Sequence, residues 1–193
     1  MTATLIACSH GTSDASGRRA IAALVAQVAE LVPGVRVKQA FVDVEKPEVD
    51  DVVARAVVDG PVVVVPLLLS TGFHVKVDIA RSVAPYPGRA VATAALGPHP
   101  LLPEVLAARL EAVGVRSDDA IVLAAAGSSD PAASVAVRTV ADDLEALLGR
   151  SVEVGFAAGV GTRIDEAVGL ARSGGAGVGG VVGRGEVGRG ERG

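Results

Sequence analysis

An internal repeat constrains the fold of this chain more than any other feature of its sequence. Residues 5–14, LIACSHGTSD, align with residues 121–130, IVLAAAGSSD, at an offset of 116 residues. Each segment is a short apolar run that ends in a glycine followed by hydroxyl side chains, and each precedes the apolar stripe of a helix. This repeat indicates two copies of one folding unit in tandem.

Each copy alternates strand-length apolar runs with helical stripes, which is typical of βαβ units in a parallel sheet. The first copy predicts strands at residues 4–9, 35–44 and 62–69, and Pro66 should loosen the pairing of the third strand. We therefore expect an α/β fold of tandem repeated parallel-sheet βαβ domains. The second copy should be incomplete, because the 193 residues end before its later strands.

The second copy runs into a glycine-rich C-terminal tail, which holds ten of the 24 glycines. Glycine loses much conformational entropy on ordering and has no side chain to pack, so we expect this tail to be disordered. The predicted organisation is a catalytic domain over residues 1–116, a partial second repeat over 117–173 and the tail over 174–193. An incomplete second domain would expose a sheet edge, which a second chain could cover in a homodimer.

The composition excludes several classes of function. A formal net charge of -4 and only four aromatic side chains argue against nucleic-acid binding. The single cysteine, Cys8, excludes an intrachain disulfide and a cysteine-based zinc cluster. No apolar run is long enough to span a membrane, and the N-terminus lacks the basic region of a signal peptide. We therefore expect a cytoplasmic protein whose partner is a small molecule or another protein.

The histidines carry the clearest chemical signal in the sequence. His10 follows the first predicted strand and His74 follows the third. Ligands of open parallel sheets bind at the carboxyl ends of the strands, so we expect both imidazoles in one crevice. Neutral imidazole binds divalent cobalt, iron, nickel or zinc, and it also accepts a proton near neutral pH. A turn or capping role is the alternative for each, and His99, between two prolines, favours a rigid turn.

The turns that hold these histidines also offer groups for an anionic substrate. Each turn leads into a helix whose first N–H groups lack intrahelical partners, and basic residues such as Arg18, Lys76 and Arg81 follow. Solvated helix faces are the alternative interpretation of the basic residues. The residues assigned to substrate binding are Ser9, Gly11, Thr12, Ser70, Thr71 and Gly72.

Four motifs together resemble one known family. They are residues 5–12, residues 40–43 with Pro47, residues 64–75 and residues 96–100. In combination they resemble the sirohydrochlorin chelatases, the class II chelatases of the cobaltochelatase and ferrochelatase type. The resemblance extends from the N-terminus to Ala171. It implies a chelatase-like fold of two similar α/β domains around a tetrapyrrole cleft.

The resemblance also implies a reaction and the residues that perform it. The chain would be a lyase that inserts cobalt or iron into sirohydrochlorin or a related tetrapyrrole, in cobalamin or sirohaem biosynthesis. His10 and His74 would bind the metal and accept the pyrrole proton, with no cofactor beyond the substrate Co²⁺ or Fe²⁺. The alternatives are a non-catalytic tetrapyrrole- or metal-binding protein and a truncated pseudoenzyme. A histidine phosphatase is disfavoured, because that chemistry uses an arginine where this chain has Ser9.

Overall fold

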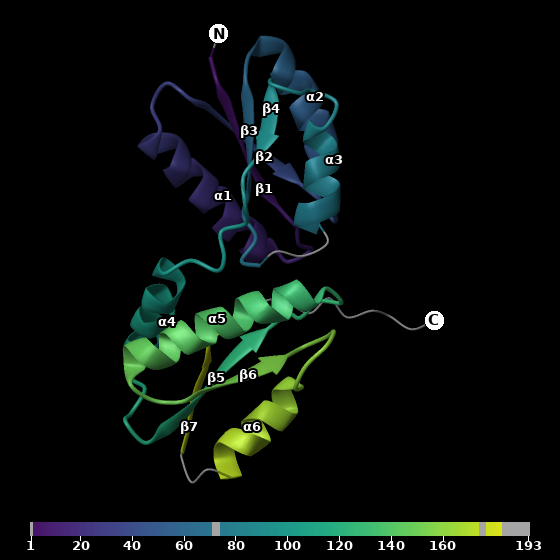
Figure 1. The fold of residues 1–193 in the computed structure, drawn as a ribbon. Coiled ribbons are helices and arrows are strands. Elements are labelled where there is room, and N and C mark those ends of the chain that lie inside the picture. The colour runs from purple at the N-terminus through teal and green to yellow at the C-terminus, as the bar shows by residue number, and fades with distance from the viewer. Residues whose placement is uncertain (1, 71–73, 174–176, 183–193) are drawn as a thin grey trace. The chain divides into compact units, whose positions relative to one another are not determined.

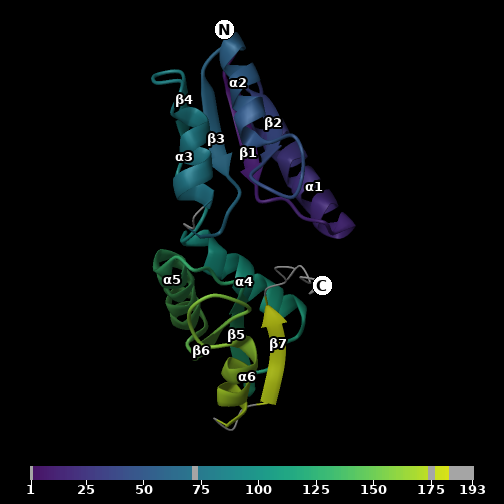
Figure 2. The ribbon, with the colours of Figure 1, turned by 90° about the vertical axis from the view of Figure 1, so that its right-hand side faces the viewer.

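The computed structural model describes residues 2–70, 74–173 and 177–182. The chain divides into two compact units, Met1–Leu96 and Gly97–Gly193 (Figures 1 and 2). Each unit is a parallel sheet with helices on both of its faces. Within the described ranges, no helix has the length and apolar character needed to cross a membrane.

The first unit contains a four-stranded parallel sheet with the strand order β2-β1-β3-β4. Its elements are β1 (Thr4–Ser9), α1 (Ala15–Leu31), β2 (Arg36–Phe41), α2 (Val49–Asp59), β3 (Val62–Pro66), the π-helix η1 (His74–Ile79), α3 (Ala80–Val83) and β4 (Ala90–Ala92). Cys8 of β1 lies in register with Ala40 of β2 and with Pro66 of β3. Strand β3 ends at Pro66, where the sequence predicts the pairing to loosen. The pairing with β1 nevertheless continues, because Leu67 N–H donates to the Cys8 carbonyl at 2.7 Å, whereas the register with β4 ends earlier, at Val64.

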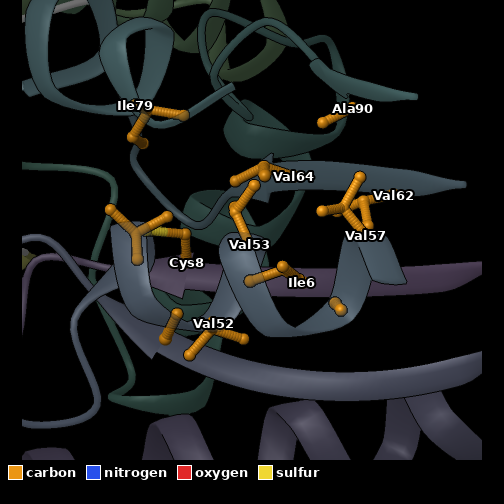
Figure 3. Packing of buried hydrophobic residues seen from close by; sticks show 12 residues of the cluster. Ile6, Cys8, Val52, Val53, Val57, Val62, Val64, Ile79 and Ala90 are labelled. Carbon is orange, nitrogen blue, oxygen red and sulfur yellow. The ribbon is translucent and has the colours of Figure 1, made fainter. Parts of the chain in front are cut away.

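The core of the first unit lies between the sheet and α2 (Figure 3). Ile6 and Cys8 of β1 pack in one cluster with Val52 and Val53 of α2. Ile79, at the end of η1, belongs to the same cluster, and all five side chains are at most 5% exposed. The core is therefore aliphatic, as a chain with only four aromatic residues requires.

Helix α1 lies on the other face of this sheet (Figure 1) and buries little of itself. Its apolar stripe predicts a helix packed closely on the sheet. In the part of the chain that the structure describes, however, no residue of α1 is fully buried. Leu24 and Leu31 are 39% and 79% exposed. The stripe is present, but it packs only loosely.

The second unit contains a three-stranded parallel sheet with the strand order β6-β5-β7. Its elements are α4 (Leu101–Ala112), β5 (Asp119–Ala125), α5 (Pro131–Leu148), β6 (Val152–Phe156), α6 (Ile164–Ser173) and β7 (Gly177–Val182). Side chains of β5 alternate between the two faces. Ile121 and Leu123 pack with α4 and α5, whereas Val122 packs with α6.

The two units repeat one arrangement, which confirms the tandem α/β fold. The orders β2-β1-β3 and β6-β5-β7 are the same, with the first strand of each copy in the centre. Among the described residues, the second copy has no counterpart of β4. It is therefore the incomplete copy, as the sequence predicts.

Two expected boundaries differ from the structure. The division that we expect after residue 116 lies between Leu96 and Gly97, because α4 packs against α5 and Leu110 enters the core of the second unit. The tail expected to be disordered from residue 174 includes β7, which pairs with β5. This ladder forms because backbone hydrogen bonds need no particular side chains. Residues 174–176 and 183–193 lie outside the described residues.

Candidate functional site

His10 lies directly after the central strand of the first sheet. It follows the last residue of β1, at the edge where parallel strands β1, β2 and β3 present their carboxyl ends. Gly11 then turns the chain with φ +97°, a conformation that favours glycine. His10 is half-buried, and its Nδ1 atom lies 3.4 Å from the carbonyl oxygen of Gly11.

The loop after β2 packs against this turn through its backbone. Val42 N–H donates to the Ser9 carbonyl at 2.9 Å, and Asp43 N–H donates to the His10 carbonyl at 3.0 Å. A Cβ atom on Gly11 would overlap the carbonyl oxygen of Asp43 and lie 3.2 Å from Glu45 N. The turn and the loop can therefore approach this closely only with glycine at position 11.

A carboxylate and a guanidinium join the same two segments. Glu45 Oε1 accepts a hydrogen bond from the Thr12 N–H at 2.8 Å, and Glu45 Oε2 lies 3.4 Å from Arg18 Nε. Arg18 Nε also donates to the Thr12 carbonyl at 2.9 Å. The Glu45 side chain is only 16% exposed, whereas that of Arg18 is 52% exposed. We call these two residues the Glu45–Arg18 pair.

This pairing changes the expected role of the turn as an anion site. The Thr12 N–H, which the sequence assigns to substrate, already donates to Glu45. The Gly17 N–H, in the first turn of α1, donates to the capping carboxylate of Asp14 at 2.6 Å. Arg18, expected to add free positive charge, pairs with Glu45. Acceptors from the protein itself therefore occupy these donors.

Ser9, also assigned to substrate binding, is buried. It is 5% exposed, and among the described residues its Oγ atom has no hydrogen-bond partner. A buried hydroxyl without a partner costs about 1–3 kcal/mol. Ser9 is therefore a polar group held beside His10, and solvent does not reach it in this conformation.

The backbone brings His74 to the same edge of the sheet as His10. His74 is the first residue of η1, and this helix follows β3, the neighbour of β1. Ile79, which is fully buried, anchors η1 in the core of the first unit. Thr71 and Gly72 lie outside the described residues, as does the side chain of His74. Ser70 precedes them and is half-buried.

Three other side chains, those of Cys8, Arg81 and His99, lie in surroundings typical of structural residues. Burial raises the pKa of Cys8 to about 12, so its thiol stays protonated. Arg81, expected to add positive charge near His74, lies 3.2 Å from the carboxylate of Asp78. His99 Nδ1 accepts the Leu101 N–H at 3.2 Å, which confirms its role in a rigid turn at the start of α4.

Sequence reasoning missed two acidic residues of this site, Asp43 and Glu45. The signal was available, because both follow β2 as His10 follows β1. Asp43 is exposed and its carboxylate accepts the Val44 N–H at 2.7 Å. Over the described residues, no three His, Cys, Asp or Glu side chains are grouped closely enough to hold a metal ion.

The second copy contains the same turn without the histidine. Gly127 has φ +85°, and a Cβ atom there would overlap the carbonyl oxygen of Ala158. Ser128 Oγ accepts the Asp130 N–H at 3.1 Å, as Thr12 Oγ1 accepts the Asp14 N–H at 3.1 Å. At the place of His10, the second copy has Ala126. The turn is thus part of the repeated fold, and the imidazole is specific to the first copy.

Known proteins place this chain in one family. The CbiX family model matches residues 4–113, which is more than half of the chain. One similar structure is SirB from Bacillus subtilis with Fe³⁺, with a TM-score of 0.75 and 23% identity over 88% of this chain and 71% of that chain. Another is the sirohydrochlorin chelatase SirB from Bacillus subtilis subspecies spizizenii in complex with cobalt, with a TM-score of 0.67 and 19% identity over 90% of this chain and 84% of that chain.

At these sequence identities, the two SirB structures show only that this chain shares their fold. The match to the family model shows that the chain belongs to the family. A search of curated proteins finds no match to the chain. The matched segment runs from β1 to the end of α4 and includes the His10 turn, the loop after β2 and the start of η1. This chain belongs to the CbiX family of sirohydrochlorin chelatases.

Proposed function

We propose that this chain inserts divalent cobalt or iron into sirohydrochlorin. The observation that carries the proposal is the CbiX match over residues 4–113, which contains both His10 and His74. The sheet topology supports it, because these histidines follow two neighbouring parallel strands and so reach one edge. SirB structures of the same fold were obtained with Fe³⁺ and with cobalt, the two metals of the proposed reaction.

The reaction exchanges two protons for one metal ion. Two pyrrole N–H bonds of the macrocycle break and release two protons to bases, the metal bonds to the ring nitrogens in their place, and the charge of the macrocycle is unchanged. Neutral imidazole can hold the incoming M²⁺ through a ring nitrogen before transfer. The same group can accept a pyrrole proton near pH 7 once the metal has left it. His10 and His74 are the residues that we assign to these steps, with the metal as a substrate and no resident cofactor.

The backbone around His10 suits a group that must keep its position during transfer. The carbonyl groups of Ser9 and His10 both accept hydrogen bonds from the loop after β2. Misplacement of a catalytic group by about 1 Å can cost about 100-fold in rate. A turn held on both sides of the histidine restricts such movement.

The proposal is tested by metal insertion with the purified chain. Under anaerobic conditions, sirohydrochlorin and Co²⁺ or Fe²⁺ should react faster with the protein than without it. The absorption spectrum of the pigment follows the reaction. His10→Ala and His74→Ala should each abolish the acceleration. His99→Ala is the matched control and should keep full activity, because His99 is exposed and serves a turn.

Three outcomes would contradict this assignment. Unchanged rates in both His10→Ala and His74→Ala would remove these residues from the site. Saturable binding of the pigment without acceleration would instead support a non-catalytic tetrapyrrole-binding protein. Loss of activity in His99→Ala as well would show that histidine substitution acts through folding.

A further inference from the structure

A single peptide unit, between Gly11 and Thr12, links the Glu45 carboxylate to the His10 ring. The Thr12 N–H that donates to Glu45 belongs to the same planar unit as the Gly11 carbonyl. His10 Nδ1 faces the oxygen of that carbonyl at 3.4 Å. Gly11 has φ +97° and no side chain of its own beside this plane, so the Glu45 hydrogen bond is a direct restraint on it, in addition to the packing of the turn against the loop. By holding the N–H, Glu45 therefore holds the acceptor that faces Nδ1.

An acceptor at Nδ1 determines which nitrogen of a neutral imidazole carries the proton. A carbonyl oxygen there favours the tautomer with hydrogen on Nδ1. The lone pair then lies on Nε2, which is the nitrogen through which this tautomer binds a metal or accepts a proton. Groups that orient an imidazole in this way typically change metal affinity or activity by about 10–100-fold when they are removed.

In the second copy, the corresponding turn and loop are joined without charged side chains. The bridges Phe41–Glu48 and Phe156–Arg163 align the loops of the two copies, so Val160 is the counterpart of Glu45. In the second copy, Ser134 takes the place of Arg18, and Ser134 Oγ donates to the Val160 carbonyl at 3.3 Å.

The charged pair is therefore confined to the copy that carries the histidine. The second copy, with Ala126 in place of His10, keeps its turn through backbone hydrogen bonds, such as that from Ala158 N–H to the Ala126 carbonyl at 2.9 Å, and through the uncharged Ser134 contact. Holding the turn onto the loop thus requires neither a carboxylate nor a guanidinium. The comparison of the two copies therefore leaves one role for the Glu45–Arg18 pair, which is to orient the peptide plane beside His10.

We propose that Glu45 and Arg18 are positioning residues that set the tautomer and orientation of His10. Glu45 holds the Gly11–Thr12 peptide, and Arg18 keeps the Glu45 carboxylate in place by pairing with Oε2. Neither residue needs to touch the metal or the macrocycle. The role of this pair in catalysis rests on the proposed chelatase activity, whereas its effect on the His10 ring does not.

The test replaces the pair by the residues of the second copy, in Arg18→Ser/Glu45→Val. The matched control is Arg36→Ser/Asp59→Val, which removes an exposed ion pair of the same unit with a distance of 2.5 Å. Metal-free protein labelled with ¹⁵N at histidine reports the tautomer of His10 by NMR. Steady-state insertion kinetics report kcat and KM for sirohydrochlorin, and thermal unfolding reports the fold.

The expected result is a shift of the His10 ring toward hydrogen on Nε2 in Arg18→Ser/Glu45→Val. Its kcat should fall about 10–100-fold while KM stays within about twofold, and its Tm should match that of the control pair. Glu45→Gln keeps an oxygen for the Thr12 N–H and should restore the Nδ1–H tautomer and much of kcat.

Several results would overturn the proposal. An unchanged His10 tautomer in the double variant would refute it, whether or not the wild-type chain is active. Loss of cooperative unfolding would refute it too, because the pair would then hold the fold itself. A wild-type chain without chelatase activity whose His10 tautomer still shifts would leave the positioning effect standing and refute the proposed function instead.

Discussion

Replacement of Gly11 by alanine tests the close packing that builds the His10 turn. Gly34 provides a matched control, because it has φ +90° and nothing lies within 4 Å of a Cβ atom built there. Both substitutions force an L-residue into the left-handed region at about 1–2 kcal/mol. The loss of unfolded-state entropy offsets about 0.4–1 kcal/mol of that cost. Gly34→Ala should therefore destabilise the first unit by about 0–1.6 kcal/mol.

Gly11→Ala should cost considerably more, because its Cβ atom meets backbone that cannot rotate away. The carbonyl of Asp43 would have to move, which costs about 1–3 kcal/mol as for other overpacked sites. The movement also disrupts the hydrogen bond from Asp43 N–H to the His10 carbonyl, worth about 1 kcal/mol. We expect Gly11→Ala to lose about 2–4 kcal/mol more than Gly34→Ala.

The single tyrosine makes this measurement specific for the first unit. Tyr86 lies in that unit, packs against its core, and the chain contains no tryptophan. Urea unfolding followed by tyrosine fluorescence therefore reports this unit alone. With an m value of about 1–3 kcal/mol/M, the midpoint of Gly11→Ala should lie about 1 M or more below that of Gly34→Ala. Equal midpoints would refute the proposed contact between the turn and the loop.

Two further predictions concern stability. Because burial raises the pKa of Cys8 to about 12, the unfolded chain releases the thiol proton from about pH 9 while the folded chain keeps it. The free energy of unfolding should then fall by up to about 1.4 kcal/mol per pH unit above pH 9. Cys8→Ala should lack this loss when urea midpoints at pH 8 and pH 10 are compared, and equal slopes in both proteins would contradict it. Asp14→Ala and Asp130→Ala each remove a carboxylate that caps a long helix. Each should lower the free energy of unfolding by about 1 kcal/mol, measured by denaturation followed by circular dichroism. An unchanged free energy of unfolding in both variants would show that these caps do not stabilise the protein.

Local patterns in the sequence located the strands and helices of the first unit, although β2 and β3 are shorter than the predicted strands at 35–44 and 62–69. The strand at Thr4–Ser9 appears where its apolar run predicts it, and β3 begins at Val62, as its apolar run predicts. The repeat between residues 5–14 and 121–130 correctly predicts two copies of one α/β unit, whereas the third strand of the second copy, β7, forms in the segment expected to be disordered. Such features are predictable because each depends on residues that are close in sequence.

The packing partners of these elements were not predictable in the same way. The apolar residues of α4 would fit either unit, and contacts with α5 place this helix in the second. Strand β7 lacks the side-chain periodicity of a strand, since half of its residues are glycine, and it forms through hydrogen bonds with the backbone of β5. In both cases the deciding contacts come from residues that are distant in sequence.

The same distinction between local and long-range features applies to the candidate site. The sequence alone identifies His10 and His74 as residues at the ends of strands, and the topology confirms that those strands are neighbours. No such pattern marks Glu45, because its role depends on a hydrogen bond from the N–H of Thr12, which lies 33 residues earlier in the chain. The sequence by itself determined the repeat, the α/β class and the histidines, because periodicity and turn chemistry are local. Only the tertiary structure decided that a carboxylate holds the peptide beside His10, because that contact exists only when two parallel strands place their following loops together.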